Sequence, residues 1–257
     1  MRYEILLSLL PLALFASASL AADQAETPAE TEDPILVELF TSQGCSSCPP
    51  ADALLGELGR RPDLVALSLH VDYWNNLGWS DPFSSAAFTE RQRSYVHQLE
   101  ARSAYTPMLV VGGEAHCVGS QEQEVSALLD SAKSRPRAGR LRITPTINSG
   151  KLALEIEVNL GTATKRPLDL MVAIAENDLH TPVRRGENMN RTLINHHVAR
   201  RLEKVASVAG TAGASRYHFE IHLAGSWKVE NLEAVAFLQE STSLTIEGVT
   251  RTALAPK

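Results

Sequence analysis

Two cysteines, Cys45 and Cys48, stand three residues apart between an apolar run and a helical stretch. Residues 35–40 form a continuous apolar run that one carboxylate interrupts, which is typical of a strand buried on both faces. Residues 51–58 have a helical pattern, and residues 64–71 make a second apolar strand. The order strand, helix, strand predicts a parallel unit with a right-handed crossover. The two thiols therefore lie where the first strand passes into the helix.

The elements that follow extend this pattern. Residues 85–102 predict a helix, and residues 108–118 predict a hairpin of two short strands. Ser120 and Gln123 form a capping box for one more helix. Strand, helix, strand, helix, hairpin, helix is the order of the thioredoxin fold. We therefore expect an α/β thioredoxin-like domain over residues 34–135.

The hydrophobic pattern changes to a two-residue period after the segment 135–139, which contains proline and glycine. Over residues 152–160, large apolar side chains alternate with Ala, Glu and Asn. Further short strands are predicted over residues 168–175, 217–223 and 235–239. Several alternating strands with turn signals predict an all-β antiparallel, sandwich-like domain over residues 140–257.

Residues 1–22 have the pattern of a secretory signal peptide, with Arg2, an apolar run over residues 5–20 and small residues that suit cleavage near Ala21. Residues 23–33 hold five acidic side chains and predict a flexible leader. The alternative is an uncleaved membrane anchor. We expect a cleaved signal and a periplasmic or secreted protein.

The net charge of −6 gives no electrostatic footprint for nucleic acid and argues against docking on an anionic membrane. No later stretch approaches the roughly 18 apolar residues of a membrane-spanning helix. We expect neither nucleic-acid binding nor stable membrane insertion after cleavage.

Export would place the cysteines in an oxidising compartment, where disulfides persist. Thiol–disulfide exchange needs one thiolate that attacks and a second thiol that resolves the mixed disulfide. We assign Cys45 as the nucleophile and Cys48 as the resolving thiol, cycling with a Cys45–Cys48 disulfide and requiring no bound cofactor. Pro49 and Pro50 fit only a first helical turn, so the helix should start near Cys48. This chemistry requires sulfur atoms that are not sealed from solvent.

Two other uses of the cysteine pair stay open. A zinc site needs a second pair of ligands, and the sequence offers neither a second such pair nor two suitably spaced histidines. The other use is a permanently oxidised bridge without a redox function.

Thr106 and Pro107 immediately precede the strand at residues 108–111. A proline at the start of a core strand is unusual unless its backbone geometry is needed. In the expected fold it would form a cis peptide facing the dithiol and leave the preceding backbone free to bind a substrate. The alternative is a trans proline at the start of an edge strand.

Residues 35–133 resemble the thioredoxin superfamily. More narrowly, Val-Glu-Leu-Phe-Thr-Ser-Gln-Gly-Cys-Ser-Ser-Cys-Pro-Pro-Ala-Asp at residues 37–52 resembles an exported bacterial family, the domain of unknown function DUF1223. His-Val-Asp-Tyr-Trp at residues 70–74, Gly-Trp at 78–79 and Tyr-Thr-Pro at 105–107 resemble the same family. The resemblance implies the fold more strongly than an activity, because the family has no assigned reaction.

Several side chains near these motifs are candidates for supporting roles. Glu38 corresponds approximately to the buried acid of thioredoxins and is a candidate proton relay to Cys48; the alternative is a carboxylate satisfied by a nearby backbone or basic group. Trp74 and Trp79, with Tyr73, would form an apolar surface for a peptide-like partner or fill the junction between the two domains.

The remaining histidines and the third cysteine suggest structural roles. His70 is expected to be a hydrogen-bonded structural residue rather than a base. Cys117 is expected to be a buried free thiol, with a third redox cysteine or an intermolecular link as the alternative. His196 and His197 would point to opposite faces of a strand, which argues against joint metal binding.

We therefore expect a thiol–disulfide oxidoreductase that acts on exported protein thiols and disulfides and exchanges electrons with a redox partner protein. The first alternative is a cell-envelope binding or assembly module with a structural disulfide. A weaker alternative is a copper-handling protein that uses the same thiols. The direction of electron flow, the partner and the oligomeric state do not follow from the sequence.

Overall fold

The computed structural model describes Met1 and residues 33–255. The predicted signal peptide and all but the last residue of the predicted leader, apart from Met1, lie outside the described residues. Among the described residues, no helix is long and apolar enough to cross a membrane.

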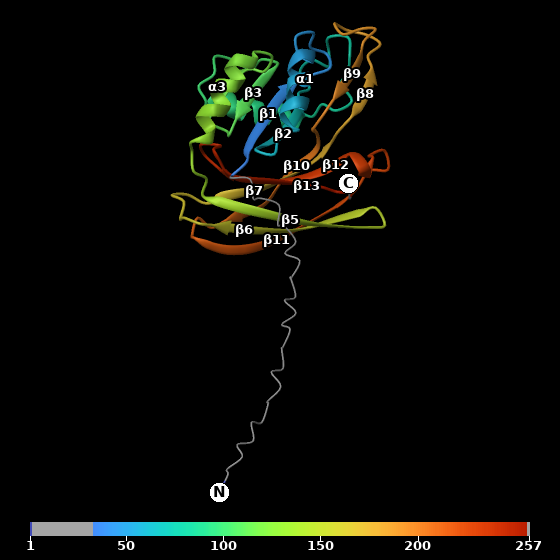
Figure 1. Cartoon of the computed structure of the whole chain (residues 1–257). Coiled ribbons are helices and arrows are strands. Elements are labelled where there is room, and N and C mark those ends of the chain that lie inside the picture. The colour runs from blue at the N-terminus through green and yellow to red at the C-terminus, as the bar shows by residue number, and fades with distance from the viewer. Residues whose placement is uncertain (2–32, 256–257) are drawn as a thin grey trace. The chain divides into compact units, whose positions relative to one another are not determined.

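A mixed sheet of eight strands runs through the described chain in the order β13-β12-β7-β10-β2-β1-β3-β4 (Figure 1). Its strands are β1 (Ile35–Thr41), β2 (Leu64–His70), β3 (Met108–Val111), β4 (Ala115–Val118), β7 (Leu168–Glu176), β10 (Val198–Val208), β12 (Leu232–Glu240) and β13 (Ile246–Ala253). β1 pairs in parallel with β2, and β3 pairs antiparallel with β1. The strand–helix–strand order and the hairpin expected for the first part of the chain are present.

The expected fold class, an α/β thioredoxin-like domain followed by an all-β sandwich-like domain, is wrong. The structure is mostly β, with 43% strand and 17% helix. β10 pairs in parallel with β2 at Val198 and Ser68, so strands from both halves of the chain share one sheet. β2 is buried along its whole length. The backbone groups on the edge of β2 opposite β1 therefore need hydrogen-bond partners, and the chain at the start of β10 supplies one at Ser68. Periodicity describes the two faces of a strand and not its edges, so this pairing could not be predicted from the hydrophobic pattern.

A second sheet of three strands packs against β7 and β12. It consists of β5 (Gly139–Asn148), β6 (Lys151–Leu160) and β11 (Gly213–His222), which Figure 1 shows below the large sheet. The alternation expected over residues 152–160 is confirmed, because the five apolar side chains of β6 are at most 2% exposed. They form one core with apolar side chains of β7 and β12.

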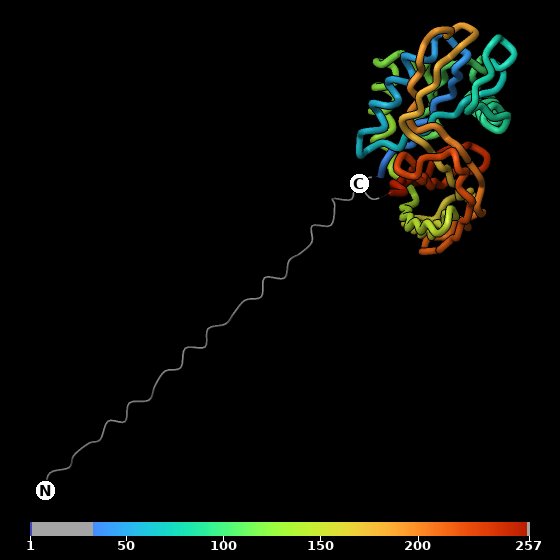
Figure 2. The backbone as a smooth tube through the Cα atoms, turned by 90° about the vertical axis from the view of Figure 1, so that its right-hand side faces the viewer, coloured from blue at the N-terminus to red at the C-terminus, as the bar shows by residue number. Residues whose placement is uncertain are grey.

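Three α-helices cover the first part of the large sheet. α1 (Pro49–Leu58) and α3 (Glu122–Lys133) pack against side chains that point to one face of β1. α2 (Ala86–Gln98) packs against the opposite face. Figure 2 shows α2 in teal on the far side of the sheet from α3 in green.

A separate hairpin reaches the end of β1. It consists of β8 (Leu179–Pro182) and β9 (Thr192–Asn195), and a short 3₁₀ helix (Val229–Asn231) occurs later in the chain. The side-chain amide of Gln43 donates to the side-chain oxygens of Thr181 and Asn195, both at 3.0 Å. In open α/β sheets, ligands bind beyond the carboxyl ends of the parallel strands. Here that edge lies beneath the hairpin.

Gly248 tests the packing of the two sheets. A Cβ at this position would overlap the carbonyl oxygen of Gly139 in the other sheet. We expect Gly248→Ala to lower the free energy of unfolding by about 1–3 kcal/mol, measured by urea denaturation with the disulfide intact. Gly225→Ala is the control, because nothing lies within 4 Å of its Cβ position. Equal stability of the two variants would contradict this account.

Candidate functional site

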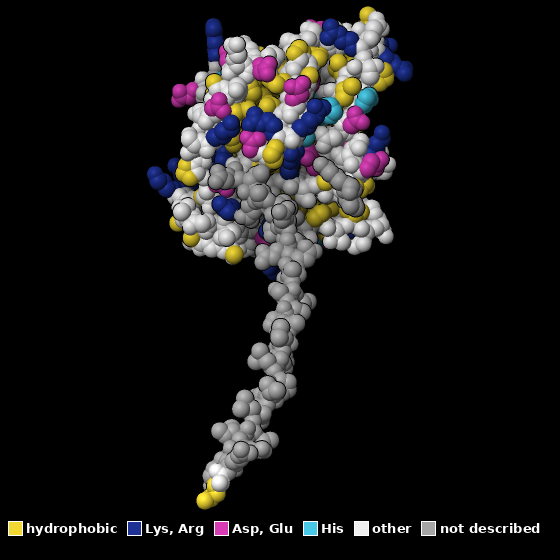
Figure 3. All heavy atoms as spheres, viewed as in Figure 1, with side chains coloured by type: hydrophobic (Ala, Val, Ile, Leu, Met, Phe, Trp, Pro, Cys, Tyr) yellow, Lys and Arg dark blue, Asp and Glu magenta, His cyan; other side chains and the backbone are white. Residues whose placement is uncertain are grey.

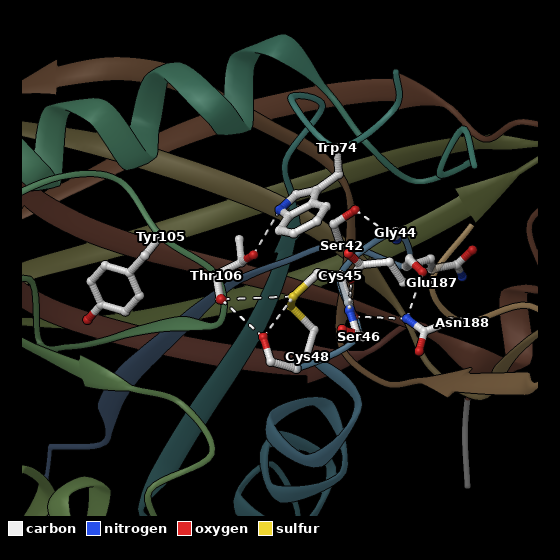
Figure 4. The surroundings of a disulfide bond; sticks show 12 residues. Ser42, Gly44, Cys45, Ser46, Cys48, Trp74, Tyr105, Thr106, Glu187 and Asn188 are labelled. Atoms are coloured by element: carbon white, nitrogen blue, oxygen red, sulfur yellow. Dashed lines mark hydrogen bonds between the residues drawn. A yellow bond between two sulfur atoms is a disulfide. The ribbon is translucent and has the colours of Figure 1, made fainter. Parts of the chain in front are cut away.

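Cys45 and Cys48 form a disulfide at the start of α1, with 5.5 Å between their Cα atoms (Figure 4). Cys48 caps α1, and the two prolines occupy its first positions. Because the first helical residues have no partner for their N–H groups, prolines fit there without loss of a hydrogen bond. Cys45 lies in the preceding turn, where its N–H donates to Ser42 at 3.1 Å. The predicted helix start is thus confirmed.

Thr106 and Pro107 lie next to the disulfide, as expected, and their peptide bond is cis. The carbonyl oxygen of Thr106 is 3.9 Å from Sγ of Cys45. The hydroxyl of Ser47 is 3.2 Å from the same sulfur and 3.5 Å from the Thr106 oxygen. Since a disulfide sulfur carries no hydrogen, the Ser47 hydroxyl is the donor in both contacts.

Trp74 covers the disulfide from one side. Its indole N–H donates to Oγ1 of Thr106 at 2.9 Å, and Figure 4 shows its ring next to Thr106 and Cys45. A Cβ on Gly44 would lie 3.1 Å from Cβ of Trp74, so the indole stem lies directly against the turn that precedes Cys45.

The loop between β8 and β9 covers the disulfide from another side. Asn188 donates to the carbonyl oxygens of Gln43 and Cys45 at 3.0 and 2.9 Å. Glu187 accepts the N–H of Ser46 at 2.9 Å. We call this loop (residues 183–191) and the segment that carries Trp74 (residues 71–85) the covering segments.

The two sulfur-bearing residues are 0% exposed, so the expectation that solvent reaches the sulfur atoms is wrong. The covering segments come from parts of the chain far from Cys45 in sequence, and no local pattern predicts where they pack. Ser46 and Ser47 between the cysteines remain exposed, so the disulfide lies just beneath the surface.

Trp79 connects the first part of the chain to the β8–β9 hairpin. Its indole N–H donates to Oε1 of Gln43 at 3.2 Å, while the amide nitrogen of Gln43 holds the hairpin. These contacts fit the predicted role at a junction. Within the described residues, the hydrogen bond of the Trp79 indole is to Gln43 and not to the cysteines.

Glu38 points away from α1, on the face of β1 that α2 covers. Arg91 of α2 binds both of its carboxylate oxygens, at 2.6 and 3.0 Å, and the hydroxyl of Tyr95 donates to it at 2.5 Å. These contacts match the alternative of a carboxylate satisfied by a basic group. We therefore assign Glu38 no part in the chemistry of the cysteines.

A different acid lies near the disulfide. Asp52 follows Cys48 by one helical turn and therefore shares its helix face, and it is 6% exposed. His70, at the end of β2, bonds to Asp81 through Nδ1 at 2.7 Å. Asp81 also accepts the N–H of Gln43 at 2.7 Å. This network confirms the prediction that His70 is hydrogen-bonded.

Two atoms of this cluster, Oδ1 of Asp52 and Nε2 of His70, have no hydrogen-bond partner among the described residues. Burial raises the pKa of Asp52 to about 7, with the charge of His70 opposing the shift. Burial alone would lower the pKa of His70, but the charge of Asp81 and its hydrogen bond raise that pKa above the ordinary value. Burial also opposes ionisation of Asp81, yet its contacts with His70 hold its pKa below the usual range.

Sequence reasoning gave Asp52 no role, although a usable signal existed. The large apolar side chains Leu55 and Leu58 of α1 are buried, and Asp52 lies about one turn before Leu55 and two before Leu58, among residues that face the sheet. An acid at such a helical position is unusual and marks a buried group.

The remaining candidates are separate from this cluster. Cys117 is a buried free cysteine, as expected. His197 bonds to Glu233 at 2.6 Å, whereas His196 lies against the Gly56 position of α1. Within residues 33–255 and Met1, no group of three or more His, Cys, Asp or Glu side chains is arranged to hold a metal ion.

The ionisation of Asp52 can be tested through the pH dependence of the free energy of unfolding. Because its pKa is raised in the folded state, the folded protein binds this proton more tightly than the unfolded chain does. Asp52 therefore costs stability increasingly between about pH 4 and pH 7. We expect Asp52→Asn to raise the free energy of unfolding by up to about 4 kcal/mol at pH 8 and to leave it nearly unchanged near pH 4.

The control for this measurement is Asp63→Asn. A hydrogen bond from Arg61 lowers the pKa of Asp63, so its substitution should reduce stability at pH 8. A stability difference for Asp52→Asn that does not change with pH would contradict the assigned ionisation.

Comparison with known proteins gives one family and several structural neighbours. The family described as "Protein of unknown function (DUF1223)" matches residues 36–239. A crystal structure from Agrobacterium tumefaciens, solved by structural genomics, is 26% identical, with a TM-score of 0.68 over 89% of this chain and 98% of that chain. HBP35 of Porphyromonas gingivalis has a TM-score of 0.65 at 11% identity, over 87% of this chain and 76% of that one, and so shares the fold alone. No curated protein matches the sequence. Since the family match spans most of its length, the chain belongs to the DUF1223 family.

Proposed function

We propose that this protein is a thiol–disulfide oxidoreductase for exported proteins, with the Cys45–Cys48 pair as its redox couple. The observation that carries the proposal is the position of Asp52, a buried carboxyl group with an unpartnered oxygen, one helical turn from the disulfide. A buried acid whose charge is not fully compensated destabilises a fold, and such groups concentrate where proton transfer is needed. A disulfide that serves only as a bridge has no use for one.

The exchange reaction uses these groups as follows. A partner thiolate attacks Sγ of Cys45, a new disulfide forms between partner and Cys45, and the Cys45–Cys48 bond breaks with its electron pair on Cys48. Asp52 then gives its proton to the Cys48 thiolate, and the resulting carboxylate lies beside His70. The reverse steps return the proton to Asp52 and release the partner thiolate.

Contacts around Cys45 favour it as the sulfur that exchanges with a partner. The Ser47 hydroxyl lies against Sγ of Cys45, and the same hydrogen bond would stabilise the Cys45 thiolate of the reduced pair, which is the form that attacks a partner disulfide. Cys48 is the N-cap residue of α1. The predicted roles of Cys45 as nucleophile and Cys48 as resolving thiol therefore remain our assignment.

Access to the sulfur atoms requires movement of the covering segments. Trp74 is only partly buried, and one hydrogen bond to Thr106 fixes its indole. Rotation of this side chain opens a path to Cys45 without unfolding the sheet.

Removal of the indole tests this gate. We expect Trp74→Ala to raise the rate at which dithiothreitol reduces the disulfide by about tenfold or more, because the rate of exchange depends on access to the sulfur. Trp227→Ala is the matched control, because Trp227 packs in the core formed with the second sheet. The rate is followed by thiol release from the oxidised protein. Equal rates of reduction for the wild type and Trp74→Ala would show that Trp74 does not limit access to the disulfide.

The second candidate function is a cell-envelope binding module in which the disulfide is a structural bridge. The complete burial of both cysteines favours it. The two functions differ in the reduction potential of the couple, because a structural bridge has a potential below about −300 mV and resists the glutathione pool.

Trapping in cells separates the two functions directly. We expect Cys48→Ala to accumulate mixed disulfides between Cys45 and exported proteins, because the resolving thiol is missing. The double variant Cys45→Ala, Cys48→Ala is the control. The structural-bridge function gains if both variants recover the same proteins, or if neither recovers any.

A further inference from the structure

The exposed apolar side chains of the described residues gather on the covering segments and the adjoining hairpin. Apart from Met1, the large hydrophobic residues exposed there are Tyr73, Leu77, Met189 and Ile194, at 37, 60, 55 and 46%. Three of the four lie on the two covering segments themselves. Scattered exposed apolar residues need no explanation, but a group on two adjoining segments marks an interaction surface.

The two covering segments touch each other, which brings these side chains onto one surface. A Cβ on Gly78 would lie 3.4 Å from Cα of Gly186, and a Cβ on Gly186 would lie 3.1 Å from Cβ of Trp79. Leu77 is next to Gly78, and Met189 lies three residues after Gly186. We call Tyr73, Leu77 and Met189 the apolar rim.

Positive charge flanks the apolar rim. Arg184, Arg185 and Arg191 are exposed on the same covering segment as Met189. Neither Arg184 nor Arg185 forms an ion pair with any described residue, and Glu187 beside them is bonded to Ser46. Figure 3 shows hydrophobic and basic side chains together at its upper right, near the end of the β8–β9 hairpin. The chain as a whole carries a charge of −6, so this basic group contrasts with the rest of the surface.

We propose that the apolar rim binds an extended protein segment that carries large apolar side chains followed by carboxylates. The inference rests on the proposed function and names the class of partner that brings a cysteine to this site. Apolar side chains of the segment cover Leu77 and Met189, and its carboxylates meet Arg184 and Arg185. An anionic membrane offers the same chemistry over a far larger charged area, so the net charge of −6 opposes it more strongly than it opposes a short acidic segment.

Occupation of the rim acts on the disulfide through the same segments. Asn188 and Glu187, which hold the turn around Cys45, lie directly before Met189 in the chain. Tyr73 lies next to Trp74, with 6.5 Å between their ring centres. A partner that displaces either segment therefore loosens the cover over Cys45.

The test uses a fluorescein-labelled, cysteine-free peptide with a run of leucines followed by aspartates, and the oxidised mature protein. We expect binding by fluorescence anisotropy, with an affinity that falls as salt is added. The double variant Leu77→Ser, Met189→Ser should bind about tenfold more weakly, which corresponds to about 1.4 kcal/mol. Arg184→Gln with Arg185→Gln should weaken binding and reduce its dependence on salt.

Ile194→Ser is the matched control and should bind as the wild type does, because strand alternation places Ile194 on the face of β9 opposite Asn195, which contacts Gln43. Thermal unfolding checks that all variants fold. The proposal is overturned if the peptide does not bind, if the rim variants bind normally, or if vesicles with anionic phospholipid bind and the peptide does not. Since the peptide has no cysteine, its binding is independent of disulfide exchange, and a failure of the proposed redox function would leave this result intact.

Discussion

The pairing of β10 with β2 determines what surrounds the disulfide. The N–H of Ser68 donates to the carbonyl oxygen of His197 at 2.7 Å, and Val198 lies beside Ser68. This contact brings the second half of the chain into the first sheet. The β8–β9 hairpin directly precedes β10 and therefore reaches the loop that follows β1. The part of the cover over Cys45 that residues 183–191 supply is a consequence of this junction.

Burial of charged groups is the second constraint. The two faces of the sheet differ in how completely a buried carboxyl group is hydrogen-bonded. On the face of α2, Glu38 is fully matched by Arg91 and Tyr95, so the pair needs no exchange with solvent. On the face of α1, Asp52 interacts with the charge of His70 and with the side chain of Thr41, but one of its oxygens is unmatched within the described chain. A buried group that is matched contributes to a unique structure, whereas an unmatched one is available for proton transfer.

Local features of the fold were predictable from the sequence because they depend on neighbouring residues. The apolar runs gave β1 and β2, the two prolines fixed the start of α1, and the alternation in residues 152–160 gave the core face of β6. Long-range pairings were not predictable in this way. β10 contains four charged residues within a short stretch, Arg200, Arg201, Glu203 and Lys204. Such a charged pattern does not predict a strand of the central sheet.

The same distinction applies to the candidate site. The cysteine pair and the Thr106–Pro107 peptide were predicted from motifs, and the structure brings them together. Glu38 was expected near the cysteines, but the alternation of β1 places it on the other face of the sheet. Asn188 and Glu187 are about 140 residues away from the turn that they hold, as the separations of 143 and 141 residues show. No spacing in the sequence encodes such a contact.

The burial of Cys117 has a consequence for the redox state of the whole chain. Burial raises the pKa of this thiol to about 11, so only about one molecule in ten thousand carries its thiolate at pH 7. An unpaired thiol in an oxidising environment would otherwise exchange with the Cys45–Cys48 disulfide or link two molecules. Because Cys117 is buried and protonated, its thiol is unreactive. The protein can therefore contain three cysteines and still form a single disulfide pairing, Cys45–Cys48.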